Sequence, residues 1–286
     1  MKTVSPSPLQ EKIETTTVWS FPERGQWATH KASYRGNWAP QIPRNLILLY
    51  SQEGDVVLDP MGGSGTTMIE AKLLKRRGVA LDIHPEVVRL AKEACDFESG
   101  PGAFEPRIEQ GDARSLKEIG DNSVDLVATH PPYLNIIRYG QKETEGDLSA
   151  SGGLNKFCDE IVKVARECFR VLKPGKYCAI LIGDTRRRRH FVPLAFQVMQ
   201  RFLKTGFILK EDIIKVQHNC TTTRYWGAQE RDFLLIMHEH LFVFRKPHQK
   251  ENMNPYKDSL KRPYRGKVED YGTEFKQKSK NKHLSS

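Results

Sequence analysis

Short apolar runs and helix-like segments alternate along most of the chain. The runs have the length and β-branched content of buried strands, whereas the helix-like segments repeat apolar residues at spacings of three and four. The pattern predicts strands at residues 55–60, 79–83, 107–113, 124–130 and 177–184. It predicts helices at residues 45–50, 68–76, 85–94, 155–172 and 192–206. Two long apolar stretches follow without a helix between them, at residues 207–216 and 232–245.

This order of elements predicts an α/β fold built on a Rossmann-like sheet. Strands joined through helices form parallel pairs, whereas two strands joined by a loop are antiparallel neighbours. We therefore expect one domain at residues 21–246, with a seven-stranded, mostly parallel sheet and an antiparallel final strand. Residues 1–20 are polar, so we expect a flexible arm there. Residues 247–286 are basic and poor in aliphatic side chains, which predicts a disordered tail.

Composition and charge narrow the class of protein. Hydrophobic residues make up 38% of the 286 residues, enough for a core, and the net charge is +10. A basic excess is typical of proteins that bind nucleic acids, although it also serves solubility, and the charge alone favours neither interpretation. No apolar run reaches the ~18 residues of a membrane span, and the N-terminus lacks the apolar segment of a secretory signal. The five cysteines form no CxxC pair, so we expect reduced thiols in a cytoplasmic protein without membrane contact.

The sequence VLDPMGGSGTT at residues 57–67 is the strongest local signal for a ligand site. A strand that runs into a glycine-rich turn and a helix brings backbone N–H groups against a ligand. The turn lacks the Gly-Lys-Ser/Thr ending of a P-loop and the spacing of a dinucleotide site. Asp59 would repel a pyrophosphate and suits the ammonium group of a sulfonium amino acid. We predict cofactor contacts from Asp59, Pro60, Gly62, Gly63, Gly65 and Thr66.

Two further aspartates end the next two predicted strands. Asp82, followed by Ile83, lies about 20 residues beyond the turn, where a carboxylate can accept both hydroxyls of a ribose. Asp112, followed by Ala113, is placed to reach an adenine amino group. One aspartate at a strand end is most often a turn or helix-cap residue, but three at consecutive strand ends favour a nucleoside ligand. We therefore include these four residues in the cofactor site.

The sequence HPPY at residues 130–133 follows the fourth predicted strand. Ligands of open α/β sheets bind outside the carboxyl ends of the strands. Prolines have no N–H donor, so the turn presents carbonyl acceptors, and Tyr133 adds a flat face for a base. Such a site can hold an exocyclic amine and aim its nitrogen lone pair. We predict His130, Pro131, Pro132 and Tyr133 as catalytic residues, in a cavity shared with the glycine-rich turn.

In this order, DPMGGSGT, Asp82, GDA and HPPY resemble the motifs of the S-adenosylmethionine-dependent DNA amino-methyltransferases, which modify adenine-N6 or cytosine-N4. The resemblance covers about residues 21–246, and VLKPGKYCAILIGDT resembles the helix–strand pair after the catalytic turn. His30 and Tyr34 resemble the N-terminal cofactor motif of the family. The resemblance implies S-adenosylmethionine as the cofactor and double-stranded DNA as the partner, with the target nucleotide turned out of the duplex into the pocket.

His130 departs from the family pattern. The catalytic tetrapeptide of the family begins with Asp or Asn in most adenine-N6 enzymes and with Ser in typical cytosine-N4 enzymes. Because His130 has no carboxylate, we expect cytosine-N4 methylation, with adenine-N6 methylation as the alternative. A neutral imidazole accepts one hydrogen bond from an amine, and protonation removes that acceptor. Further alternatives are an RNA amino-methyltransferase, an inactive nucleic-acid-binding relative, and a structural His130 that leaves the Pro131 carbonyl to orient the amine.

Two other segments are predicted to contact DNA. Arg186, Arg187, Arg188 and Arg189 follow the fifth predicted strand at the edge that carries the site, where a phosphate contact is more plausible than a solvated loop. The loop at residues 218–231 contains Arg224, Tyr225 and Trp226, whose rings could stack on an extruded base. Packing of Trp226 in the core is the equal alternative.

The remaining expectations concern metals and partners. Neither the cysteines nor the histidines have the spacing of metal ligands, so we expect no metal. No large insertion interrupts the domain, which favours a short recognition sequence read by a monomer. The family resemblance also suggests a restriction-modification setting, with a cognate restriction endonuclease that acts separately.

Overall fold

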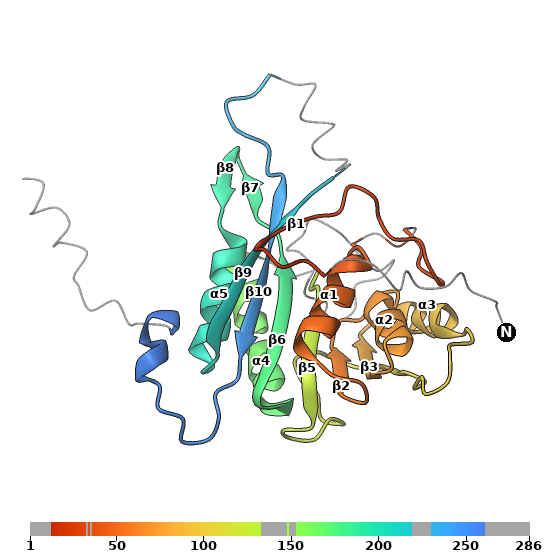
Figure 1. Cartoon of the computed structure of the whole chain (residues 1–286). Coiled ribbons are helices and arrows are strands. Elements are labelled where there is room, and N and C mark those ends of the chain that lie inside the picture. The colour runs from red at the N-terminus through yellow and green to blue at the C-terminus, as the bar shows by residue number, and fades with distance from the viewer. Residues whose placement is uncertain are drawn as a thin grey trace, which may run out of the picture.

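The computed structural model describes residues 13–32, 34, 36–132, 148, 153–218 and 230–260. Figure 1 shows a central sheet with helices on both of its faces. The strands of this sheet are β1 (Val18–Ser20), β2 (Val56–Asp59), β3 (Arg77–Asp82), β4 (Arg107–Gln110), β5 (Val124–Thr129), β6 (Leu172–Ile182), β9 (Ile208–Val216) and β10 (His238–Arg245). The helices are α1 (Gln41–Tyr50), α2 (Thr66–Leu73), α3 (Pro85–Cys95), α4 (Leu154–Val171), α5 (Leu194–Lys204) and the 3₁₀ helix η2 (Asn254–Ser259).

The sheet has the predicted Rossmann-like topology. Its order is β1-β9-β10-β6-β5-β2-β3-β4, and β5, β2, β3, β4 and β6 run parallel to their neighbours within that group. β10 is antiparallel to both β6 and β9, which confirms the expected antiparallel final strand. Each β–α–β crossover places a helix on one face, so the parallel core is covered on both sides.

Two helical layers bury the two faces of the sheet (Figure 1). Side chains alternate along a strand, so Leu126 and Ala128 of β5 pack toward α1 whereas Val127 packs toward α4 and α5. α2 and α3 continue the first layer over β3 and β4. Ile161, Val164 and Cys168 repeat at helical spacing on α4 and are fully buried, as their sequence pattern predicts.

Both ends of the predicted domain extend further than expected. Residues 18–20, assigned to a flexible arm, form β1, which pairs in parallel with β9 and buries Trp19 to 1% exposure. The sheet therefore has an eighth strand in the described part of the chain. At the other end, η2 belongs to the segment expected to be disordered, and Arg245 pairs with Glu251 at 2.8 Å. Apolar burial of Trp19 and this ion pair order the two segments.

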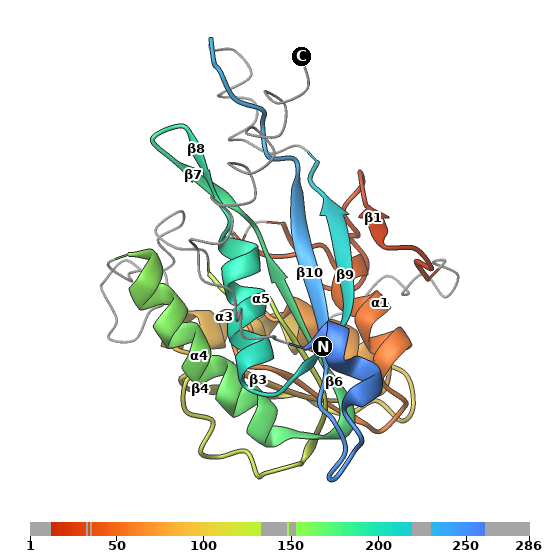
Figure 2. The ribbon, with the colours of Figure 1, turned by 90° about the vertical axis from the view of Figure 1, so that its left-hand side faces the viewer.

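A short hairpin also lies outside the sequence prediction. β7 (Thr185–Arg187) and β8 (His190–Val192) are antiparallel and follow directly after β6. Figure 2 shows this hairpin beyond the sheet, on the side where β9 ends and β10 begins. Among the described helices, none is long and apolar enough to cross a bilayer. Cys95, Cys158, Cys168 and Cys178 are buried free thiols.

Candidate active site

The glycine-rich turn and the HPP turn are neighbours at one edge of the sheet. β2 ends at Asp59 and β5 ends at Thr129, and these strands pair in parallel, so the chain leaves both in the same direction. The hydroxyl of Thr129 donates a hydrogen bond of 2.8 Å to Oδ1 of Asp59. This bond links the two turns directly.

A cleft of about 760 Å³, including its open mouth, lies over these strand ends. The predicted residues that line it are Tyr34, Asp59, Pro60, Gly62, Gly63, Asp82, Ile83, Asp112, Ala113, His130 and Pro132. Because both turns contribute to one lining, the expected shared cavity is confirmed. The sequence analysis missed further lining residues, namely Gly36, Asn37, Trp38, Met61, His84, Gly111 and Leu148.

Asp59 holds the turns together from inside the fold. It is 2% exposed, and besides Thr129 it accepts hydrogen bonds from the Thr67 hydroxyl at 2.6 Å and the Met61 N–H at 3.1 Å. Burial disfavours the charged carboxylate and raises its pKa to about 6, although the three hydrogen bonds act in the opposite direction. The Asp59 carboxylate is therefore a fixed acidic group in the lining of the cleft.

The glycines of the turn allow a close approach of β2 and β3. The N–H of Gly62 donates to the Leu81 carbonyl at 2.8 Å, and a Cβ at Gly62 would lie 2.9 Å from the Cβ of Ala80. Gly65 has a φ of +87° and immediately precedes α2, a conformation that favours glycine. Gly65 and Thr66 do not stand among the lining residues. They support the turn without facing the cleft, and the Thr66 hydroxyl donates a hydrogen bond of 2.5 Å to Oδ1 of Asn37.

Asp82 lies at the end of β3, beside the turn. Its two carboxylate oxygens accept the N–H of Gly63 and the N–H of His84, each at 3.0 Å. These bonds fix the carboxylate at the cleft wall. The predicted position for ribose contacts is thus occupied by a preorganised acceptor.

Asp112 follows β4 and forms an ion pair with Arg114 at 2.6 Å, while Arg114 also reaches Glu160 at 2.6 Å. Burial alone would raise the pKa of Asp112, but the hydrogen bonds from Arg114 outweigh it and the pKa falls. The described lining contains the carboxylates of Asp59, Asp82 and Asp112 but neither lysine nor arginine. This charge distribution fits a ligand with a cationic amino-acid group and a nucleoside, and it opposes a pyrophosphate.

His130 lines the same cleft as the three aspartates. Its ring stacks on Trp38, with 5.9 Å between the centroids and 23° between the planes. Burial lowers its pKa to about 4, although the charge of Glu239 and a hydrogen bond to the Gly36 backbone favour the protonated ring. The imidazole is therefore neutral at pH 7, and when one nitrogen donates its hydrogen the other is an acceptor.

His30 lies outside the cleft lining. Its Nε2 is 2.7 Å from Oε1 of Glu70, and this carboxylate also accepts hydrogen bonds from Trp27 Nε1 at 2.7 Å and Arg44 at 2.9 Å. Glu70 is fully buried in α2. The structure thus places His30 in a buried network that holds the segment before α1 onto α2, and not at the predicted cofactor contact.

The other predicted catalytic and DNA-binding residues divide into two groups. Pro131 is buried beside the lining and Pro132 belongs to it. Tyr133, Arg224, Tyr225 and Trp226 lie outside the described residues. Their predicted roles therefore stay predictions.

The four consecutive arginines form the tip of the β7–β8 hairpin. Arg188 and Arg189 occupy its two-residue turn with φ values of 48° and 71°. Arg186 and Arg189 pack over the ring of Phe233, and Arg189 pairs with Asp232 at 2.8 Å. Arg187 and Arg188 are exposed. Arg189 is exposed as well, but its guanidinium is held by Asp232, so the hairpin presents Arg187 and Arg188 as the arginines without such an ion pair in the described residues.

Sequence comparisons relate the chain to several methyltransferases. M.HpaI of Haemophilus parainfluenzae, a Type II methyltransferase, is 35% identical over 83 residues, which are 29% of this chain and 26% of that protein. M.MjaI of Methanocaldococcus jannaschii, also Type II, is 29% identical over 163 residues, 48% of this chain and 54% of that protein. A tRNA (guanine(10)-N2)-dimethyltransferase of Methanothermobacter thermautotrophicus is 34% identical over 101 residues, 35% of this chain and 29% of that protein. The chain thus spans about a quarter to about half of each relative.

Comparison with solved structures shows the same fold. A structure of an S-adenosylmethionine-dependent methyltransferase from Methanosarcina mazei has a TM-score of 0.50 at 17% identity and covers 71% of this chain and 97% of that one. The family model described as DNA methylase, of the N6/N4 type, matches residues 2–93 and 124–285. The chain therefore belongs to the N6/N4 DNA methylase family, and its cofactor is S-adenosylmethionine.

Proposed function

We propose that this protein transfers a methyl group from S-adenosylmethionine to the exocyclic N4 amine of cytosine in double-stranded DNA. The observation that carries the proposal is the neutral His130 at the end of β5, which lines the same cleft as Asp59 and Asp82. The position that holds Asp or Asn in most adenine-N6 enzymes here carries an imidazole, which offers one uncharged acceptor. That acceptor would hold and orient the cytosine amine, whose nitrogen lone pair is conjugated with the ring and must be turned toward the methyl donor.

The chain contributes binding and orientation. When bound, S-adenosylmethionine supplies an electrophilic methyl group on its sulfonium sulfur. Asp82 is placed to accept the ribose hydroxyls, and Asp59 and Asp112 supply negative charge along the same wall. At the end of β5, the His130 ring and the Pro131 carbonyl would accept the two N–H groups of the target amine and direct its lone pair toward the methyl group. Such positioning of two reactants accounts for a large part of the rate without a covalent enzyme intermediate.

The β7–β8 hairpin supports a DNA partner. A two-residue hairpin turn with two positive φ values favours Asn-Gly or Gly-Gly, yet this turn contains Arg188 and Arg189. Backbone strain of this kind occurs often at functional sites. Exposed arginines on a projecting ribbon are suited to phosphate contacts that position the duplex. We extend the proposal to a short recognition site and a restriction-modification setting.

Two other substrates remain as alternatives to be separated by experiment. Adenine-N6 is the second activity of the family, and an RNA substrate is favoured by the tRNA-modifying relative. The protein is incubated with duplex DNA or total RNA and with S-adenosylmethionine carrying a deuterated methyl group. The nucleic acid is then digested to nucleosides, which are identified by mass spectrometry.

Labelled N4-methylcytosine from DNA is the expected product. Labelled N6-methyladenine would contradict the cytosine assignment, and label in RNA alone would contradict the DNA assignment. His130→Ala, treated in parallel, controls for a contaminating methyltransferase because a contaminant would give the same yield in both samples. Sequencing of methylated plasmid DNA then gives the recognition site.

A further inference from the structure

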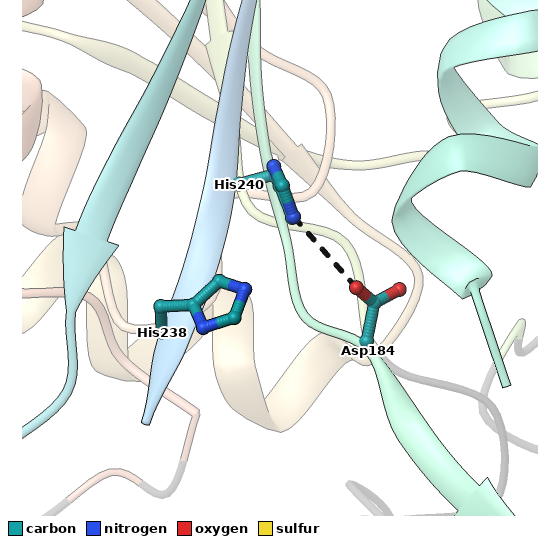
Figure 3. A group of neighbouring side chains, drawn as sticks. All are labelled: Asp184, His238 and His240. Carbon is teal, nitrogen blue, oxygen red and sulfur yellow. Dashed lines mark ion pairs between the residues drawn. The ribbon is translucent and has the colours of Figure 1, made fainter. Parts of the chain in front are cut away.

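Three potential metal ligands meet outside the active-site cleft. His238 and His240 lie on β10, and Asp184 lies two residues beyond the end of β6 (Figure 3). In the antiparallel pairing of these strands His240 faces Ile182, so the same register places His238 opposite Asp184. Residues two apart on a strand share a face. All three side chains therefore project from the face covered by α5, where His240 also contacts Phe196.

Asp184 carries a buried oxygen that needs a positive partner. Its side chain is 1% exposed, and Oδ1 accepts the N–H of Ala195 at 2.8 Å. Oδ2 is buried without a hydrogen bond, and it lies 3.7 Å from Nε2 of His240, too far for one. An ionised carboxylate oxygen buried in this way is costly unless a cation or a donor reaches it. Oδ2 points into the space between the two imidazoles (Figure 3).

His240 has the second partner that a metal-binding histidine requires. Its Nδ1 is 3.0 Å from Oδ1 of Asp212 on β9, so Nδ1 donates its hydrogen to this carboxylate and Nε2 is left as the metal-binding atom. A histidine bound to a metal usually donates its other N–H to a carboxylate or carbonyl, which sets the tautomer and orients the ring. In His240, the atom opposite this contact is Nε2, which lies 3.7 Å from Oδ2 of Asp184.

We propose that Asp184, His238 and His240 bind one divalent transition-metal ion of the zinc type. Two imidazoles and one carboxylate form a common three-residue set for such ions, with water in the open position. The three ligand atoms lie within 4.8 Å of one another. Bonds of about 2.0–2.1 Å in a tetrahedral site bring ligands to about 3.4 Å, so binding requires a modest rotation, which the partly exposed ring of His238 permits.

The position of this three-residue site indicates a structural role near the DNA-binding edge. Asp184 immediately precedes β7, and its Oδ1 holds the first turn of α5. A bound ion would tie the end of β6, the start of β10 and the base of the β7–β8 hairpin to one another. None of the three ligands lines the cofactor cleft. The ion would therefore fix the hairpin that carries Arg187 and Arg188, and methyl transfer chemistry would not pass through it.

The test is metal binding by the full, untagged chain after treatment with EDTA. Calorimetric titration with Zn²⁺ and absorption spectroscopy with Co²⁺ should each give one equivalent, with the intense d–d bands of tetrahedral Co²⁺. His238→Gln and Asp184→Asn should weaken Zn²⁺ binding at least tenfold. The exposed His190 of β8 provides the matched control, because His190→Gln should bind like the unmodified chain.

Thermal unfolding separates binding from folding. Zn²⁺ should raise the melting temperature of the unmodified chain and of His190→Gln, since a ligand that binds the folded state stabilises it. It should not raise that of His238→Gln, whose circular dichroism verifies that the variant is folded. Failure of the unmodified chain to bind one equivalent, or equal binding by folded His238→Gln, would overturn the proposal and leave Asp184 and His240 as a simple ion pair.

Discussion

The two halves of the cleft are built in different ways. The proposed cofactor half, at the ends of β2 and β3, is held by the buried Asp59, which accepts three hydrogen bonds, and by the partly buried Asp82, which accepts two backbone hydrogen bonds. In the proposed target half, at the end of β5, His130 is held by stacking against Trp38 and by a hydrogen bond to the Gly36 backbone. Every turnover uses the same cofactor, whereas the target base must enter and leave. The comparison teaches that the cofactor, which is the same in every turnover, has a site fixed by several hydrogen bonds. The target base, which must enter and leave, meets a residue that is held chiefly by ring stacking.

Removal of Glu70 should have the largest effect, because Glu70 is the centre of the network behind the cofactor half. Glu70→Ala leaves buried Arg44, His30 and Trp27 without their shared acceptor. Loss of one partner of a buried charge pair costs about 3–5 kcal/mol. Urea denaturation should show a loss of this size in the free energy of unfolding. Glu86, half-exposed on α3, is the control; equal losses in Glu70→Ala and Glu86→Ala would refute the role of the network.

Asp82→Asn should separate cofactor binding from methyl transfer. The amide replaces a charged acceptor by a neutral one, and hydrogen bonds to charged groups contribute about 1.5–3 kcal/mol. The Kd of S-adenosylmethionine should therefore rise about 10- to 100-fold by calorimetry, with little change in kcat at saturating cofactor. Asp96→Asn, at an exposed position after α3, should bind normally. An unchanged Kd in Asp82→Asn would remove Asp82 from the cofactor site.

Replacement of the exposed hairpin arginines should lower DNA affinity by a smaller factor than Asp82→Asn lowers cofactor affinity. Replacement of both Arg187 and Arg188 by Gln removes two phosphate contacts, so DNA affinity at moderate salt should fall several-fold. The slope of log K against log salt should decrease in magnitude by about 2. Cofactor affinity should be unchanged. Arg166→Gln, exposed on α4, is the control, and a salt slope as steep as that of the unmodified chain would show that the hairpin does not contact DNA.

The protonation state of His130 should be insensitive to pH over the physiological range. Burial lowers its pKa to about 4, so the neutral acceptor persists above that value and is lost only as the pH falls toward 4. NMR titration of isotope-labelled histidine, with the signal assigned by its loss in His130→Ala, should show no change for this ring between pH 6 and 8. A midpoint near the ordinary value of about 6.5 would mean that the target half is open to water.

Much of the cofactor half could be predicted from the sequence, because short stretches of sequence determine where each strand ends and where the chain turns. Parallel strands end at the same edge, so the aspartates at positions 59, 82 and 112 had to converge there. The glycines at positions 62 and 65 report close backbone approach and a positive φ. The spacing of His30 and Tyr34 was less informative. Tyr34 lines the cleft, but His30 is drawn into the buried network by Glu70.

The remaining features depend on contacts between distant segments. Trp38 and Leu148 come from stretches without periodic pattern, and only the folded chain brings them to the cleft. The Arg188–Arg189 turn has none of the residues typical of a two-residue hairpin. The His238–His240 pair gains Asp184 through the β6–β10 pairing alone. Sequence spacing therefore could not indicate this cluster.

The most direct test of the proposed role of His130 compares the effect of His130→Ala on cofactor affinity with its effect on the rate of methyl transfer. In the unmodified chain and in the variant, the Kd of S-adenosylmethionine is measured by calorimetry and the methylation of duplex DNA by single-turnover kinetics. The account predicts a fall in the methylation rate of about 100-fold or more, in line with the loss of one preorganised polar group at a reacting centre, and a Kd within a factor of about three. An unchanged rate, or parallel loss of rate and cofactor affinity, would contradict the assignment of His130 to the target half of a shared cleft.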